Sequence, residues 1–112
     1  MKKKLFQNYN FSFEKNEKKL ISTFCKQALK QMGNDNKYFA EVKAFNTILE
    51  KINSNTDTVK LTKDEKTRFA FQLKLNMDSI EKQIRNSFFI KKWMMKSLLK
   101  QYSNLYETHF KG

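Results

Sequence analysis

The stretch LISTFCKQALKQMG, residues 20–33, repeats its apolar side chains at intervals of three and four residues and then ends on a glycine. This spacing gives a helix an apolar face that fills about half of its circumference. Lys26 and Lys30 fall on the opposite side, and Gly33 stands where a left-handed C-terminal cap is wanted. The segment therefore predicts an amphipathic helix over about 14–32. Its apolar face consists of Leu20, Ile21, Phe24, Cys25, Ala28, Leu29 and Met32.

A second helix is predicted over about 36–52. The turn GNDN, residues 33–36, precedes it, and Asn34 or Asp35 can cap its first turn. Its apolar residues follow a 4-3-4-3 spacing, which is typical of helix packing. These residues are Tyr38, Val42, Phe45, Leu49 and Ile52, with Ile48 beside them.

Two more helices are predicted after the polar loop 53–58. TKDE, residues 62–65, matches a capping box, so a third helix should begin at Lys63 and end near residue 86. A narrow apolar stripe runs along it: Phe69, Ala70, Leu73, Met77, Ile80 and Ile84. The dipeptide NS at 86–87, with Ser87 as a cap, separates it from a fourth helix over about 88–106. One continuous helix over 63–106 is the alternative, but it would be long for a chain of this size.

Aromatic residues alternate with polar ones before the first helix. Leu5, Tyr9, Phe11 and Phe13 share one side of residues 5–13, which indicates an extended segment. A lone strand leaves its backbone groups unpaired, so it needs a partner. The other β-like piece is Val59–Leu61, and a two-stranded pairing with the arm 1–13 is predicted.

Composition supports an all-α fold. The chain has 112 residues, 39% of them hydrophobic, but only two Gly and no Pro, which are too few for the tight turns of a β-sandwich or barrel. The length favours a single domain, and the short connections at 33–36 and 86–87 favour antiparallel neighbours. We therefore predict one helical domain over 1–112, a compact bundle of about four helices with an N-terminal extended arm.

Residues that carry chemistry are scarce. His109 is the one histidine and has no partner at a metal-binding or acid–base spacing. Cys25 is the one cysteine and lies on an apolar helix face, where a thiol packs rather than reacts. Two glycines cannot build a phosphate-binding loop. We expect no catalytic residue, metal, cofactor or small-molecule substrate, and so no enzyme.

Positive charge is concentrated at both ends of the chain. The net charge is +12, from 23 basic and 11 acidic residues, and residues 31–81 are neutral overall. Only Arg68 and Arg85 are arginines, which argues against sequence-specific reading of bases but only weakly against phosphate contact. An AT-rich gene would also enrich lysine without any selection for binding. Because such a gene would enrich glutamate as well, it explains the number of lysines better than the excess of basic over acidic residues.

The stretch SFFIKKWMMKSLLKQY, residues 87–102, contains four lysines and no acidic residue. On a helical wheel its apolar residues fill a wide arc, while lysines gather on a separate arc together with two aromatic rings. Lysines with interleaved rings are typical of single-stranded nucleic-acid binding. The candidate nucleic-acid-binding residues are Lys82, Arg85, Phe89, Lys92, Trp93, Lys96 and Lys100. The alternative is a structural helix with a solvated edge and a buried Trp93. A membrane-surface helix is disfavoured, because its apolar face is needed for the core.

A second function class rests on Phe71 and Leu75, which fall outside the apolar stripe of the third helix as an i,i+4 pair. Either another element such as the N-terminal arm covers them, or they form an exposed contact for a protein partner or a second copy.

No run of residues is long and apolar enough for a membrane span, so a cytoplasmic protein without a membrane partner is expected. The chain is predicted to be a small non-enzymatic binding module. It is compatible with an accessory protein or inhibitor from a bacterium, plasmid or phage.

Overall fold

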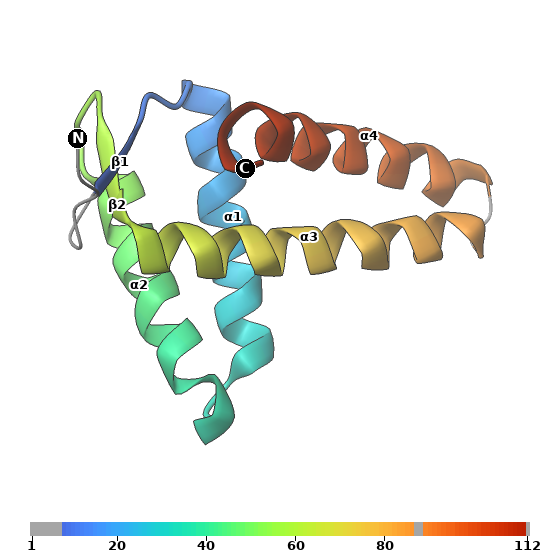
Figure 1. Ribbon diagram of the computed structural model, residues 1–112. Coiled ribbons are helices and arrows are strands. Elements are labelled where there is room, and N and C mark those ends of the chain that lie inside the picture. The colour runs from blue at the N-terminus through green and yellow to red at the C-terminus, as the bar shows by residue number, and fades with distance from the viewer. Residues whose placement is uncertain (1–7, 87–88, 112) are drawn as a thin grey trace. The chain divides into compact units, whose positions relative to one another are not determined.

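The computed structural model describes residues 8–86 and 89–111, with side chains for residues 9–86 and 91–111. The predictions for Leu5, the Ser87 cap and the ring of Phe89 lie outside this description. Within it the chain forms β1 (Asn8–Phe11), α1 (Lys15–Met32), a 3-10 turn η1 (Asn36–Tyr38), α2 (Phe39–Asn53), β2 (Val59–Thr62), α3 (Lys63–Arg85), α4 (Phe89–Leu105) and a π turn η2 (Tyr106–Phe110) (Figure 1). The predicted all-helical class with a minor two-stranded sheet is confirmed.

The chain divides into two units, residues 1–68 and 69–112. The first turns of α3 belong to the first unit and the rest of α3 belongs to the second. The single domain over 1–112 stays a prediction. The observed helices begin and end within a few residues of the predicted bounds, and a break separates α3 from α4.

In unit 1–68, β1 pairs with β2 in antiparallel fashion, with Phe11 opposite Val59 and Tyr9 opposite Leu61. The predicted pairing is therefore confirmed. Alternation explains it, since Val59 and Leu61 are buried while Lys60 and Thr62 are exposed. The arm continues past the strand, and the ring of Phe13 stacks on that of Phe11 at 5.1 Å.

The core of this unit lies between α1 and α2. Phe24 of α1 and Phe45 of α2 are buried, with ring centroids 6.1 Å apart. Each helix buries the face that its spacing predicted, because residues three and four apart lie on one side. The other buried residues are Ile21, Cys25 and Met32 of α1 and Ala44, Ile48 and Ile52 of α2.

Polar groups define the helix ends. The Glu14 amide donates to Glu17 Oε1 at 2.8 Å at the start of α1, and the Asp35 side chain accepts from the Lys37 amide at 3.1 Å before α2. Gly33 ends α1 with φ of 58° and ψ of −136°, so it has the predicted positive φ but not the left-handed helical conformation.

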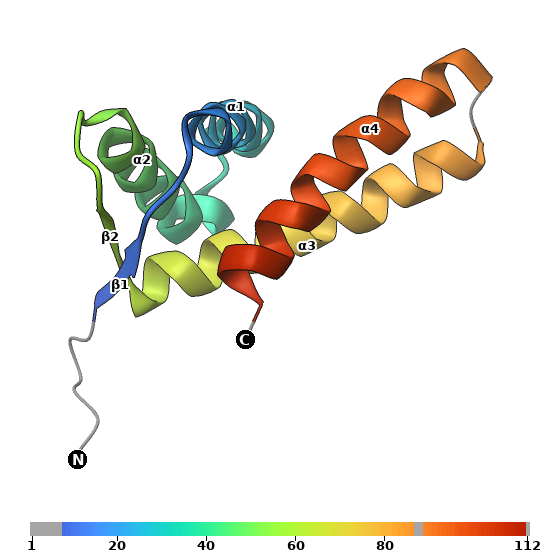
Figure 2. The same cartoon turned by 90° about the horizontal axis from the view of Figure 1, so that it is seen from above.

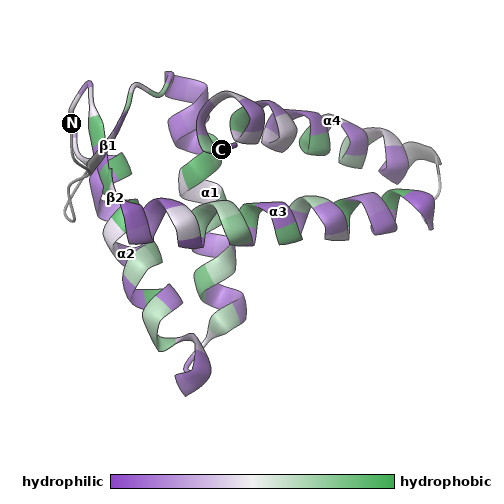
Figure 3. Ribbon diagram, in the orientation of Figure 1, coloured by the Kyte–Doolittle hydropathy of each residue, from purple (hydrophilic) through white to green (hydrophobic). Residues whose placement is uncertain are grey.

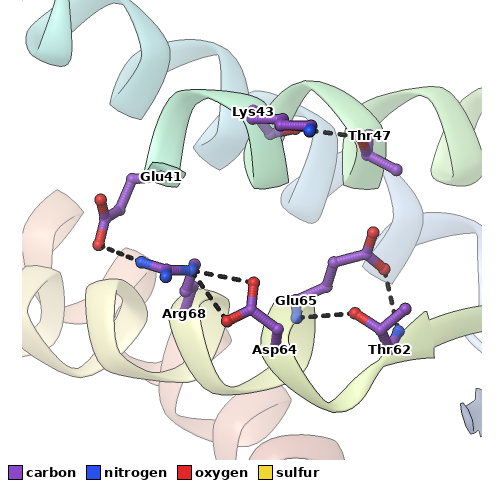
Figure 4. A network of polar contacts seen from close by, with 7 residues as sticks. All are labelled: Glu41, Lys43, Thr47, Thr62, Asp64, Glu65 and Arg68. Atoms are coloured by element: carbon purple, nitrogen blue, oxygen red, sulfur yellow. Dashed lines mark hydrogen bonds and ion pairs between the residues drawn. The ribbon is translucent and has the colours of Figure 1, made fainter. Parts of the chain in front are cut away.

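A polar network joins the first turns of α3 to α2 (Figure 4). The predicted capping box is present: the Glu65 amide donates to Thr62 Oγ1 at 3.1 Å, and the Thr62 amide donates to Glu65 Oε1 at 3.0 Å. Arg68 donates from Nε to Asp64 and from Nη1 to Glu41 Oε2 of α2 at 2.8 Å. The hydrogen bond to Asp64, with the nearby carboxylate charges, raises the pKa of Arg68. Unit 1–68 therefore pairs several of its basic groups internally.

In unit 69–112, the remainder of α3 runs antiparallel beside α4 (Figures 1 and 2). Phe69, Leu73 and Ile80 are buried and Met77 and Ile84 are half-buried, as the narrow stripe predicted. The helix α4 ends at Leu105, within a residue of the predicted end, and the chain continues into η2, which buries Phe110. We refer to this unit as the C-terminal hairpin.

Candidate functional site

The buried side of α4 is narrower than its sequence predicted. Tyr102 and Leu105 are buried and Met95 and Leu99 are half-buried. Met94, which the wheel placed in the same apolar arc, is 62% exposed, and Leu98 is exposed as well. Among the described residues of its own unit, α4 lies beside one long helix, α3, and one neighbour can cover only part of a wide apolar arc. The expected broad core face is therefore only partly buried.

Trp93 is 74% exposed, whereas the alternative of a structural helix with a solvated edge required this side chain to be buried. Lys96 and Lys100 are exposed too and follow it by three and seven residues, a spacing that puts all three on one helix face. Lys92 is half-buried at the border of this face. We call Trp93, Lys96 and Lys100 the Trp93 face. Helical spacing in the sequence grouped these residues, and the structure shows that all three side chains are exposed.

The charge of α4 is not neutralised within the described part of the chain. The helix contains no acidic residue, and none of Lys91, Lys92, Lys96 or Lys100 forms an ion pair with a described carboxylate. Unit 1–68 differs, since Lys51 contacts Glu65 Oε1 at 2.7 Å and Arg68 contacts two acids. Unpaired lysines on a helix are available to an external anion. Figure 3 shows hydrophilic and hydrophobic residues interspersed along α4.

Lys82 and Arg85 are exposed in the last turns of α3. The hairpin brings this end of α3 to the end of α4 that carries Trp93, whereas Lys100 lies further along α4 (Figure 1). The side-chain amide of Asn86 donates to the Lys82 carbonyl at 3.1 Å and closes the last turn of α3. The two basic groups therefore flank one end of the Trp93 face.

Phe71 and Leu75 are 60% and 48% exposed. The hypothesis that another element covers them is not supported, since no described segment buries either side chain. They lie on the side of α3 away from its buried stripe. The structure thus keeps them as an exposed apolar pair, separate in sequence from the Trp93 face.

Two single residues have ordinary structural surroundings. Burial raises the pKa of the Cys25 thiol to about 12, so it is protonated at neutral pH and a poor nucleophile. His109 is half-buried, with its ring edge-on to Phe110 at 6.5 Å between centroids.

Among the described residues no group of three or more His, Cys, Asp or Glu side chains is placed to hold a metal ion. None of the described helices is both long enough and apolar enough to cross a bilayer.

Sequence reasoning missed three exposed apolar residues: Phe39, Met94 and Leu98. Phe39 is 72% exposed at the start of α2, and its position outside the 4-3-4-3 spacing was a signal that could have identified it. Met94 and Leu98 gave no such signal, because their spacing matches that of the core residues of α4.

No protein-family model, curated protein or solved structure matches this chain. Its fold and surface therefore describe a helical protein whose C-terminal hairpin exposes a tryptophan beside lysines that form no ion pair with a described carboxylate.

Proposed function

We propose that the protein is a small non-enzymatic binding module that contacts nucleic acid, or a complex containing it, through the lysine-rich face of α4. The observation that carries the proposal is the exposure of Trp93 beside Lys96 and Lys100. An exposed ring beside lysines on a helix without acidic residues is the combination that single-strand binding surfaces use, since bases stack on the ring while lysines meet phosphates.

Charge supports the same partner. A phosphate backbone attracts lysines that have no carboxylate partner among the described residues, and releasing its counterions supplies much of the affinity. Lys82 and Arg85 extend the positive charge at one end of the hairpin. Lysines lack the bidentate fork that reads base edges, so the contact is expected to be largely independent of sequence.

Fluorescence anisotropy with short labelled DNA and RNA at two salt concentrations tests the proposal. We expect binding that weakens as salt rises, because each phosphate contact releases counterions. The double variant Lys96→Gln/Lys100→Gln should bind more weakly than the wild type. Its matched control is Lys26→Gln/Lys30→Gln, which removes two exposed lysines at the same spacing from α1.

Two results would contradict the proposal. Absent or salt-indifferent binding would remove nucleic acid as the partner. An equal loss in both double variants would show that net charge, rather than the α4 face, governs the contact.

The exposure of Phe71 and Leu75 favours a second candidate, an interaction module or inhibitor that docks on a protein or on a second copy of the chain. We rank it second, because a net charge of +12 opposes self-association. Sedimentation velocity over a range of protein concentrations tests the second copy directly. Association that Leu75→Asp abolishes would support it, and a sedimentation coefficient unchanged by concentration or by the variant would count against it.

A further inference from the structure

Building on the proposed function, we infer that the Trp93 face selects single-stranded over double-stranded nucleic acid. The indole of Trp93 stacks on an unpaired base, while Lys96 and Lys100 contact phosphates of the same strand. The inference depends on the exposure of the ring, the common face of the three residues and the absence of described ion-pair partners for the lysines.

The dimensions of the face fit a short length of one strand. A helix rises 1.5 Å per residue, so Trp93 and Lys100 are about 10 Å apart along the axis of α4. Stacked nucleotides advance about 3.4 Å each along one strand, so this distance corresponds to roughly three nucleotides. A contact of this size places one base on the ring and leaves neighbouring phosphates for the two lysines.

A duplex offers less to this surface. The faces of its bases are covered by their neighbours, so the indole could reach one only by unstacking a base step, at a cost of about a few kcal/mol. Nor can the lysines compensate by reading base edges in a groove, because they act as point charges. Phosphate contact remains possible on a duplex, but the contribution of stacking is lost.

A lipid surface fits the same face poorly. An interfacial helix needs a continuous apolar side turned to the membrane. On α4, the exposed side that carries Trp93 also carries Lys96 and Lys100, whereas Tyr102 and Leu105 are buried. Met94 and Leu98 are exposed as well, but they make only a small apolar area, on a different side of the helix from Lys96 and Lys100.

Trp93 is the only tryptophan of the chain, so its emission reports directly on the proposed contact. Titration of the full-length protein with an oligothymidylate should quench this emission. A duplex of equal length should bind more weakly and quench it less. The same titration with vesicles of equal parts phosphatidylserine and phosphatidylcholine provides the comparison with lipid.

Substitution separates stacking from charge. Trp93→Leu should weaken single-strand binding by about 5- to 150-fold, the range that a lost base–aromatic stack produces. Trp93→Phe should retain part of the affinity, because a ring remains. Phe39→Leu is the matched control, since it removes an equally exposed aromatic ring from α2 and should leave binding unchanged.

The outcomes distinguish this inference from the proposed function. Salt-dependent binding with no preference for single strands, or with no effect of Trp93→Leu, would overturn the stacking contact and leave the proposed function standing. Absence of binding to every oligonucleotide would overturn both. A blue shift of the emission with vesicles, together with no binding to any oligonucleotide, would overturn both and assign the face to a lipid surface.

Discussion

The ring of Phe110 lies 4.7 Å from the ring of Phe69, so the π turn that follows α4 packs against α3 inside the C-terminal hairpin. A second contact supports this end of the hairpin, where Lys74 Nζ lies 5.6 Å from the ring centroid of Tyr106. The end of the hairpin opposite the connection between α3 and α4 is thus held together partly by residues outside α4, the helix that carries the Trp93 face.

Phe110→Ala should destabilise the protein by about 3 kcal/mol, because it removes a buried ring and leaves a cavity beside Phe69. Urea unfolding followed by circular dichroism measures the change. Phe39→Ala removes an exposed ring and should change the stability by less than about 0.5 kcal/mol. Equal effects of the two substitutions would show that Phe110 does not hold the hairpin.

Thr62→Ala should lower the free energy of unfolding by about 1 kcal/mol, since it removes the acceptor for the Glu65 amide at the start of α3. Thr62→Ser keeps the hydroxyl and should preserve most of the stability. Thermal unfolding of both variants provides the measurement. If the serine variant loses as much as the alanine variant, packing rather than capping is the function of Thr62.

Cys25 should make the protein less stable at high pH. Its thiol has a pKa of about 12 in the folded chain against an ordinary value of 9.0, so between these values the unfolded state releases the proton first. Stability is therefore unaffected below about pH 9 and falls as the pH rises towards 12, by up to about 1.4 kcal/mol per pH unit.

Cys25→Ala isolates this contribution from the titration of lysines. The free energy of unfolding of the variant should decline less steeply between pH 9 and pH 11 than that of the wild type. Parallel pH profiles would show that the thiol titrates alike in both states.

Substitutions on the Trp93 face should leave the fold intact. Trp93→Leu and Lys96→Gln alter exposed side chains, so each should change the free energy of unfolding by less than about 0.5 kcal/mol. Urea unfolding of each variant checks this, and any loss of binding can then be attributed to the surface. A large destabilisation would instead make Trp93 a structural residue.

Periodicity predicted most of this fold because local rules determine it. The stripe from Phe69 to Ile84, the capping box of Thr62 and Glu65, and the strand over 8–11 each follow from spacing within a few residues. The grouping of Trp93 with Lys96 and Lys100 follows from helical spacing in the same way.

Exposure could not be predicted by these rules. The helical wheel places Met94 and Tyr102 on the apolar side of α4, but it does not show how many neighbours the helix has. It therefore could not predict that Met94 is exposed and Tyr102 is buried. The π turn was missed for a related reason, since its added residue breaks the spacing on which the prediction depended.

The pairing of β1 with β2 also has a consequence for the order of events during folding. Phe11 and Val59 are neighbours in the sheet but are separated in sequence by all of α1 and α2. Closing so long a loop costs entropy before the strand contacts compensate for it. The contact of α1 with α2 and the C-terminal hairpin need only short loops, so we expect both to form early. The strand pairing should then be the slow, final step, and substitutions in β1 should accelerate unfolding more than they retard folding.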